Sequence, residues 1–478
     1  MKKLILTLSL ILITLSTQAE IKLPAIFGDN MLLQQAADVK LWGWADKGKR
    51  IEVSPSWTTQ TFSAIADDSG KWTLKLATPT ASYEKHSVSI SENGTNEVIL
   101  RNILVGEVWL CSGQSNMEMP MKGFKNQSVE GSNKDILKSK NENIRLITVK
   151  RNSTLEPQED ITGRWVEAAP ESVSEFSATA YYYGRLLNEM LDIPVGLILS
   201  AWGGSWAEAW MDKSMLTGFP EINIPAKEED IKEKNRTATV LYNGMINPIV
   251  GYTIKGAIWY QGESNYERPD QYQTLFPKLV EEWRRVWELG DFPFYYCQIA
   301  PYNYASIAPE EMHGGKFNSA FLREAQYKSA EIIPNSGMVV LMDIGEEFGI
   351  HPQKKEIGGE RLAMMALAKT YGMKGFAYES PVFKEMTVEG SKATLSFDRA
   401  PMWLTAYGKE LQKFEIAGED KVFYPAKAKI QRSKIEVSSD KVAKPVAVRY
   451  AFKDFVVGDL FSTEGFPVSS FRTDNWDE

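Results

Sequence analysis

Cysteine and histidine are scarce in this sequence of 478 residues. It contains two cysteines, Cys111 and Cys297, and three histidines. A domain whose fold depends on disulfide bonds needs more cysteines than this, so a disulfide-stabilised scaffold is excluded. With so few soft ligands and no paired cysteine motif, we expect neither a structural nor a catalytic zinc site, and no other metal.

Positive charge is also in short supply. Asp and Glu number 62 against 54 Lys and Arg, the net charge is −8, and no run of Lys and Arg stands out. Nucleic acids and anionic membranes are bound by concentrated basic faces, so we expect neither as a partner. The 43% hydrophobic and 24% charged residues are ordinary for a soluble globular protein, and the length favours two or three domains.

Long apolar runs are absent apart from one near the N-terminus. Lys2 and Lys3 precede the apolar residues 4–15, and small residues lead up to a cleavage position after Ala19. A buried helix is the alternative, but so short a run at the extreme N-terminus favours a signal peptide over residues 1–19. The run is too short to span a bilayer. We therefore expect a secreted or periplasmic protein without a membrane span.

Residues 20–104 show the pattern of a β-sandwich domain. Short runs of alternating or continuous apolar residues are separated by turn signals that contain Asp and Gly, at 46–48 and 67–70. Turns at this spacing are typical of sandwich domains. The expected strands are 39–44, 51–53, 72–76 and 98–100.

From residue 105 to residue 375 the pattern changes to strands that alternate with helices. The short apolar runs suit strands buried on both faces of a parallel sheet, and amphipathic stretches separate them. This alternation predicts an α/β sheet with right-handed crossovers. The expected strands are 108–111, 195–199, 254–260, 294–299 and 339–342. The expected helices are 272–286, where Pro277 indicates a late start or a kink, and 357–368.

Two other segments complete the organisation of the chain. Residues 376–478 return to short strands and are expected to form a second β region. The segment 121–143 is rich in Lys, Asn and Ser and is expected to be an exposed excursion. The strands expected in the second β region are 393–397, 414–416, 434–437 and 446–450.

Ser115 is a candidate nucleophile. The segment Gly-Glu-Val-Trp-Leu-Cys-Ser-Gly-Gln-Ser-Asn-Met at 106–117 runs from an apolar strand into a tight strand-to-helix turn at this serine. Ligands of α/β sheets gather at the carboxyl ends of the strands, and N–H groups at a helix start can stabilise an oxyanion. A serine that only caps the helix is the alternative. Met117 stands where a G-x-S-x-G elbow has its second glycine.

Three more polar blocks follow expected strands. The first contains Gly203 and Gly204, whose N–H groups are unobstructed, although an ordinary turn also explains two glycines. The second ends on Asn265, whose side-chain amide is able to donate to an oxyanion, unless it is only a polar loop residue. The third contains His351. A lone histidine is often structural, but this one alone among the histidines follows a strand of the expected α/β sheet.

In combination the four blocks resemble the SGNH hydrolases, whose name lists a Ser, a Gly, an Asn and a His. The match is closest to the sialate O-acetylesterase group, on Gly-Gln-Ser-Asn-Met at 113–117, Trp-Gly-Gly-Ser at 202–205, Gln-Gly-Glu-Ser-Asn at 261–265 and Ile-His-Pro at 350–352. The resemblance covers nearly the whole chain after the expected signal peptide. It implies a flavodoxin-like parallel sheet domain of the SGNH type, flanked by β-sandwich regions, and removal of O-acetyl groups from sialic acids.

The resemblance also implies a role for each matched residue. Ser115 is the nucleophile, His351 is the general base, and the oxyanion hole consists of the N–H groups of Ser115 and Gly204 with the Asn265 amide. Such an acyl-transfer mechanism needs no cofactor.

The third member of a catalytic triad is the least defined by the resemblance. Many SGNH enzymes place an acid three residues before the histidine, but Phe348 occupies that position here. Asp343 is the expected acid because it ends the strand. Glu346, Glu347 or a backbone carbonyl, which would leave a Ser-His dyad, are the alternatives.

The expected substrate is O-acetylated sialic acid or another acetylated carbohydrate. An esterase that acts on xylan or a similar polysaccharide is one alternative, and a non-catalytic carbohydrate-binding protein is another. If the strand order is the one usual for this resemblance, the Trp259 strand lies between those of Cys111 and Cys297. The two cysteines are then too far apart for a disulfide and should be unpaired.

Overall fold

One long strand, β7 (Thr95–Gly113), joins the N-terminal β region to the central sheet of the protein. The structure is a computed structural model that describes residues 21–314 and 317–476, so the expected signal peptide at 1–19 lies outside the described residues. The first part of β7 pairs with β6 (Ser82–Glu92) and β1 (Leu32–Gln34). Its last residues pair with β10 (Val195–Ala201) and β11 (Gly256–Tyr260). The expected boundary at residue 104 thus falls inside a continuous strand.

The central sheet has the strand order β13-β12-β11-β7-β10-β8-β9. All neighbours from β13 to β8 are parallel, and only β9 is antiparallel to its neighbour. The strands not yet given are β8 (Asn141–Thr148), β9 (Val166–Ala168), β12 (Phe294–Cys297) and β13 (Ser336–Val339). The predicted α/β organisation, with additional β-sheets before and after it, is confirmed.

The strand order reverses at β7. Strands β8 and β10 follow it in the chain and lie on one side, whereas β11, β12 and β13 lie on the other. In open α/β sheets the crevice at such a reversal, at the carboxyl ends of the strands, is the usual place for a ligand. Because Gly113 ends β7, the residues that follow it lie at this reversal, at the carboxyl ends of the strands.

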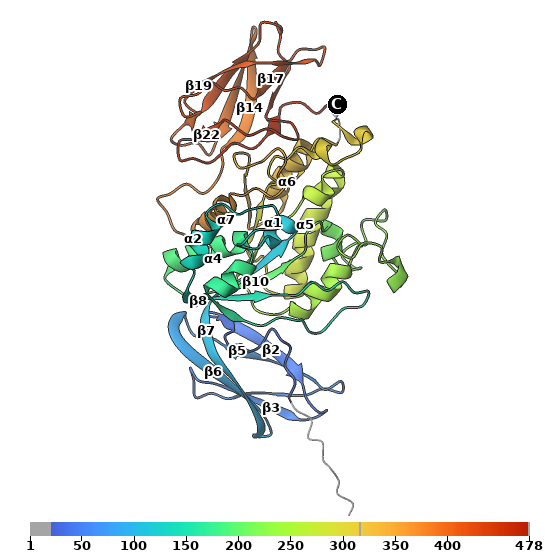
Figure 1. The fold of residues 1–478 in the computed structure, drawn as a ribbon, viewed down its shortest axis with the longest axis vertical. Coiled ribbons are helices and arrows are strands. Elements are labelled where there is room, and N and C mark those ends of the chain that lie inside the picture. Colours follow the sequence, from blue (N-terminus) through green and yellow to red (C-terminus); the bar gives the residue numbers. More distant parts are fainter. Residues whose placement is uncertain (1–20, 315–316, 477–478) are drawn as a thin grey trace, which may run out of the picture.

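Helices cover both faces of the central sheet (Figure 1). Side chains of α4 (Ala178–Leu191) and α7 (Lys355–Lys369) belong to the core on one face, and side chains of α5 (Pro269–Trp287) and α6 (Ala320–Ile332) belong to the core on the other. Their buried residues recur at helical spacing, as the sequence predicts for α5 and α7. The short helices are α1 (Ser115–Glu118), α2 (Ser132–Leu137) and α3 (Pro170–Glu175).

Two element boundaries differ from the prediction. Helix α5 begins at Pro269 and continues through Pro277, so a late start is wrong. A proline in the first turn loses no helix bond, and the buried apolar face of α5 offsets the bond lost at Pro277. The strand expected at 339–342 is shifted, because β13 ends at Val339.

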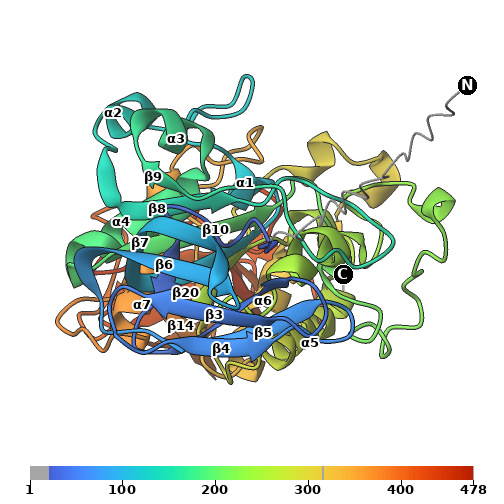
Figure 2. The ribbon, with the colours of Figure 1, turned by 90° about the horizontal axis from the view of Figure 1, so that it is seen from below.

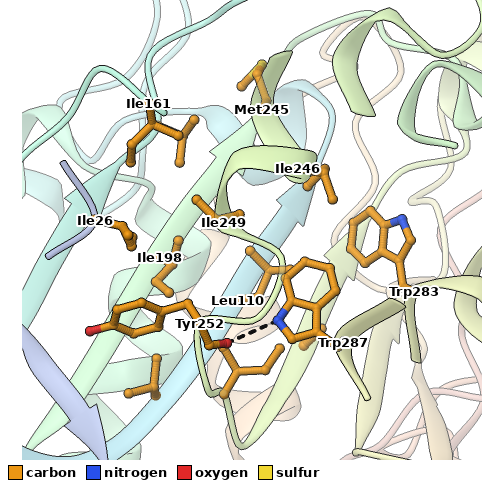
Figure 3. Packing of buried hydrophobic residues seen from close by; sticks show 14 of the residues in the cluster. Ile26, Leu110, Ile161, Ile198, Met245, Ile246, Ile249, Tyr252, Trp283 and Trp287 are labelled. Carbon is orange, nitrogen blue, oxygen red and sulfur yellow. Dashed lines mark hydrogen bonds between the residues drawn. The ribbon is translucent and has the colours of Figure 1, made fainter. Parts of the chain in front are cut away.

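The N-terminal strands share one hydrophobic core with a face of the central sheet. Ile26, Leu110, Ile198, Tyr252 and Trp287 all belong to this core and are at most 3% exposed. Figure 3 shows these side chains packed together, with the Trp287 indole N–H donating to the Tyr252 carbonyl oxygen at 3.1 Å. Burial of each large apolar side chain stabilises the fold by about 1.5–3 kcal/mol. The N-terminal region is therefore fixed firmly to the α/β body.

The remaining strands form the two ends of the molecule, with the α/β body between them (Figures 1 and 2). The other N-terminal strands are β2 (Asp38–Trp44), β3 (Arg50–Pro55), β4 (Phe62–Ile65) and β5 (Lys71–Ala77). The C-terminal sheets have the orders β14-β15-β20-β19, β18-β17-β21-β23 and β16-β22.

The C-terminal strands include all four segments expected after residue 376. They are β14 (Val382–Glu389), β15 (Lys392–Asp398), β16 (Leu404–Thr405), β17 (Phe414–Ala417), β18 (Phe423–Pro425), β19 (Lys427–Gln431), β20 (Lys434–Ser438), β21 (Ala447–Tyr450), β22 (Phe461–Ser462) and β23 (Phe471–Arg472).

Both cysteines lie in the central sheet and are buried and unpaired, as expected. Cys111 lies in β7, Cys297 lies in β12, and β11 separates the two strands. Among the helices of the described residues, none has the length and apolar character needed to cross a membrane.

Candidate active site

Ser115 is the first residue of α1 and is half-buried directly after the end of β7. Gln114 fixes this turn between two strand ends. Its backbone N–H donates to Tyr260 O at 2.9 Å, and its side-chain oxygen accepts the N–H groups of Gly262 and Ser264, each at 3.3 Å. Because Ser115 opens a helix, its own N–H has no acceptor within that helix. The nucleophile candidate thus has a free backbone donor beside it.

The turn at Gly203 and Gly204 lies against Ser115. A Cβ atom on Gly203 would stand only 3.2 Å from Ser115 Cβ, so a side chain at this position would crowd the serine. The Gly203 N–H donates to Glu118 Oε2 at 2.7 Å, and Arg151 binds the same carboxylate with two hydrogen bonds of 2.6 Å. Gly204 has a φ of +71°, and among the described residues no acceptor faces its N–H. Of the two glycines, Gly204 is therefore the one whose backbone N–H is available to a ligand.

Asn265 is almost completely buried, and the protein already engages its side chain. Its Oδ1 accepts the Ala207 N–H at 3.1 Å and a Gln261 Nε2 hydrogen at 2.6 Å. Its Nδ2 donates to Glu208 Oε2 at 3.1 Å. The residue joins the loop after β10 to the turn after β11. One N–H of the amide is committed to Glu208, which leaves one for any oxyanion.

His351 is half-buried and oriented by the segment that follows α1. Its Nδ1 is hydrogen-bonded to the side-chain oxygen of Gln127, and the Phe124 ring packs edge-on at 5.3 Å between centroids. An amide oxygen only accepts, so Nδ1 carries the proton and Nε2 keeps its lone pair. Burial, with a smaller contribution from the positive charge of Lys355, lowers the pKa of His351 to about 4. The imidazole is therefore neutral at physiological pH.

The structure does not bring Asp343 to His351. Both carboxylate oxygens of Asp343 accept hydrogen bonds from the guanidinium group of Arg361, at 2.8 and 2.7 Å. Of the alternatives, Glu346 accepts the backbone N–H of Gln353 at 2.8 Å and Glu347 is exposed. Among the described residues, the partner of the imidazole Nδ1 is the Gln127 amide. The contacts of Asp343 thus do not support its assignment as the triad acid.

Asn116, the residue after the serine, connects three of the four sequence blocks. Its Nδ2 donates to a Glu263 carboxylate oxygen and, at 3.0 Å, to the backbone oxygen of Ile350. Its Oδ1 accepts a hydrogen from the Lys355 ammonium group. The turn that carries Ser115 is therefore bonded directly to the residue before His351. Within the described residues, Ser115 Oγ itself makes no hydrogen bond to the imidazole.

The two charged partners of Asn116 are buried. Burial is the main reason that the pKa of Glu263 is raised and that the pKa of Lys355 is lowered, to about 7. The second carboxylate oxygen of Glu263 has no hydrogen-bond partner among the described residues. Burial of a charged group costs free energy unless the group is paired or hydrogen-bonded. The hydrogen bonds of the Asn116 amide to Glu263 and Lys355 therefore offset a large part of this cost.

Gln127 and Lys355 were not found from the sequence. Gln127 belongs to the segment 121–143, which we expected to be an exposed excursion, yet Met121 and Val129 are buried and Phe124 packs on His351. The apolar residues scattered in this polar segment were the only signal. A lone lysine near a helix start gives none, because such residues are ordinarily solvated.

No group of three or more His, Cys, Asp or Glu side chains in the described part of the chain is arranged to hold a metal ion.

A serine at the carboxyl end of the central strand and a neutral histidine, connected through the hydrogen bond from Asn116 to Ile350, are groups that an ester hydrolase uses. Residues 105–363 match the model of the family described as carbohydrate esterase, sialic acid-specific acetylesterase. The chain belongs to this family and is a carboxylic ester hydrolase.

Similar proteins agree with this placement. The sialate O-acetylesterase of Homo sapiens is 29% identical over 402 residues, which cover 78% of this chain and 75% of that protein. The mouse (Mus musculus) sialate O-acetylesterase is 28% identical over 435 residues and 78% of both chains. The crystal structure of a carbohydrate acetylesterase from Xanthomonas citri covers 95% of this chain and 100% of its own, with a TM-score of 0.86 and 34% identity.

Proposed function

We propose that the protein hydrolyses O-acetyl esters of sialic acids through a Ser-His acyl-enzyme mechanism. The observation that carries this proposal is the hydrogen bond from Asn116 to Ile350, because it holds the neighbours of Ser115 and His351 together. The sialate O-acetylesterases that match most of the chain support sialic acid as the sugar.

The tautomer of His351 suits a general base. With the Nδ1 proton directed to Gln127, Nε2 accepts the Ser115 hydroxyl proton while Oγ attacks the acetyl carbonyl carbon. The bond between the acetyl carbon and the sugar oxygen then breaks, and the imidazolium returns its proton to that oxygen. A water molecule repeats the sequence on the acetyl-serine and releases acetate.

Two backbone donors and one side-chain donor are available to the developing oxyanion. The N–H groups of Ser115 and Gly204 are free among the described residues, and Asn265 has one N–H beyond its bond to Glu208. Removal of one such donor costs about 3 kcal/mol in other hydrolases. In this mechanism the chain acts as a Ser-His dyad with Gln127 as the orienting residue.

A second candidate substrate is an acetylated polysaccharide such as xylan. The likeness to the carbohydrate acetylesterase from Xanthomonas citri supports it, because that structure matches nearly the whole chain. The two candidates share the chemistry at Ser115 and differ only in the sugar that the crevice accepts.

Acetate release decides between them. Purified protein would be incubated with O-acetylated N-acetylneuraminic acid and with acetylated xylan, and with the Ser115→Ala variant as the control for uncatalysed release. We expect faster release from the sialic acid ester. Release from xylan alone would favour the second candidate, and equal release by the variant would refute the serine mechanism.

The location and the domain arrangement belong to the same proposal. A signal peptide at residues 1–19 and a secreted or periplasmic protein are supported by the apolar run at 4–15. We take residues 20–104 and 376–478 as β-sandwich regions that flank the catalytic domain at 105–375. Detection of the mature N-terminus at Glu20 by Edman degradation of the exported protein would test the first point.

A further inference from the structure

A cavity of about 440 Å³ adjoins the glycine turn at Ser115. Asn235 Nδ2 donates to Gly203 O at 2.7 Å, and Arg236 Nε donates to Gly204 O at 3.2 Å. Arg236 also lines the cavity, so the cavity wall is continuous with the turn that lies against the nucleophile. Volumes of ~300–1,000 Å³ are usual for sites that hold one small ligand.

Three cationic side chains on this cavity have hydrogen-bond donors to spare. Lys232 is exposed and makes no ion pair among the described residues. Arg236 pairs with Glu233 through Nη1 at 3.2 Å, and Arg268 pairs with Glu208 through Nη1 at 2.7 Å. Arg268 Nη2 has no hydrogen-bond partner within the described part of the chain.

The carboxylates on the same cavity are already hydrogen-bonded within the protein. Glu208 and Glu233 are the partners of the two arginines. Glu221 accepts from Gln271 at 2.8 Å, and Asp230 accepts the backbone N–H groups of residues 226 and 227 at 3.0 and 3.2 Å. Both oxygens of Glu208 are engaged, by Arg268 and Asn265, so the part of the cavity beside Trp206 offers mainly donors, which fits a ligand with a carboxylate rather than one with only hydroxyl groups.

Trp206 holds both guanidinium groups in place. The Cζ atoms of Arg268 and Arg236 lie 4.6 and 5.7 Å from the centre of its ring. Cation–π contacts of this kind restrict the two side chains before any ligand arrives. A site whose donors are already oriented loses less entropy on binding.

We propose that this cavity binds the carboxylate of an acidic sugar whose acetyl ester lies at Ser115, with Lys232 and Arg236 as the principal donors. The inference deepens the proposed function and rests on it. In the ring form of a sialic acid the carboxylate is bonded to C2 and the glycerol side chain, whose hydroxyl groups can carry acetyl esters, is bonded to C6, so the two groups are separate parts of one molecule. An ester at the nucleophile and a carboxylate in the adjoining cavity are therefore compatible, whereas a neutral sugar has nothing to place there.

Masking the carboxylate tests the proposal. The values of kcat/KM are measured for O-acetylated N-acetylneuraminic acid and for its C1 methyl ester, which keeps the acetyl group and loses the charge. We expect the wild type to prefer the free acid by about tenfold or more, as for one charge-assisted hydrogen bond. In Lys232→Gln and Arg236→Gln the ratio should fall toward one. Because each ratio is taken within one enzyme, a general loss of catalysis cancels.

Lys234→Gln is the matched control. Lys234 is exposed in the same segment and does not line the cavity, so the same loss of charge should leave the ratio unchanged. A wild-type ratio near one, or a ratio that Lys232→Gln and Arg236→Gln do not alter, would overturn the subsite.

Inhibition separates this inference from the proposed function. Hydrolysis of 4-nitrophenyl acetate is followed in the presence of N-acetylneuraminic acid or its methyl ester. If sialic acid esters are not turned over but the free acid alone inhibits, the substrate proposal fails and the carboxylate site stands. If neither compound inhibits, and the acid and its ester are hydrolysed equally, the carboxylate site fails and the esterase stands.

Discussion

The pH dependence of hydrolysis offers a direct test of the environment of His351. The base works in its deprotonated form, so activity is present above its pKa and is lost as the pH falls through it. With a pKa of about 4, the acid limb of kcat/KM should have its midpoint near pH 4. About 97% of the activity then remains at pH 5.5, whereas an unperturbed imidazole with a pKa of 6.5 would leave about 9%.

The contact with Gln127 predicts how this limb can be moved. Gln127→Glu places a carboxylate at the imidazole Nδ1 with little change in shape. A negative charge in direct contact raises a histidine pKa by about 1–3, so the midpoint should rise to about pH 5–7. Activity at pH 5 falls, while activity at pH 8 is retained. The assay is chromatographic measurement of acetate released from 4-nitrophenyl acetate between pH 3.5 and 9, with circular dichroism to confirm folding at each pH.

Gln353→Glu serves as the comparison for Gln127→Glu. Gln353 is exposed, lies two residues after His351 and bonds to Ser128 Oγ rather than to the imidazole. The same added charge should therefore move the midpoint much less. A wild-type midpoint at pH 6 or above, or equal shifts in the two variants, would refute the reasoning.

Four further substitutions test other residues of the site. Ser115→Ala and His351→Ala should each lower kcat by several orders of magnitude without unfolding the protein, and activity within tenfold of wild type in either variant would contradict the mechanism. Asp343→Asn should lower the melting temperature, because it weakens the largely buried ion pair with Arg361. It should change kcat by less than tenfold. A larger loss of kcat would support Asp343 as the acid of a catalytic triad. Asn265→Ala should lower kcat about a hundredfold with little change in KM, and a raised KM with kcat intact would make it a substrate-binding residue.

The fold was predictable where local pattern decides it. The strands at Val108–Cys111 and Val195–Leu199 are apolar on both faces, as suits buried parallel strands of this length, and they were placed correctly. Cys111 and Cys297 were expected to be unpaired from the strand order, and they are. The limits of β13 were wrong because Val340 and Met342 are as apolar as a strand but belong to the C-terminal core.

Only those residues of the candidate site that belong to the four sequence motifs could be predicted. Ser115, Gly204 and His351 each follow a strand, and the topology of a parallel sheet brings strand ends together. The partner of His351 was not predictable in this way. Asp343 is the right residue type, but it lies four residues beyond the end of β13, and its carboxylate pairs with Arg361 of α7, a side-chain contact that no local pattern in the sequence marks. Gln127 reaches the imidazole from a distant polar segment, and only tertiary structure shows that contact.

The amide of Asn116 is the element on which the assembly of the site depends most. It bonds at once to Glu263, to Ile350 and to Lys355, so a change there disconnects two catalytic loops and removes a hydrogen-bond partner from each of two buried ionisable groups. Each buried group that loses its partner costs about 1–3 kcal/mol, and a charged one more. Asn116→Leu, which is similar in size, should therefore lower the free energy of unfolding by several kcal/mol and lower kcat as well.

Two added substitutions separate the stability effect from the loss of geometry. Lys355→Met and Glu263→Gln, added to Asn116→Leu, remove the buried charges and should restore much of the melting temperature. They do not restore the bond to Ile350, so kcat should stay low. Thr179→Val, which removes only the bond of 3.0 Å from Thr179 Oγ1 to the Asn116 carbonyl oxygen, is the control and should change both quantities little. If the triple variant recovers kcat together with stability, Asn116 does not position the nucleophile against the base, and the alignment of Ser115 with His351 must come from the strands alone.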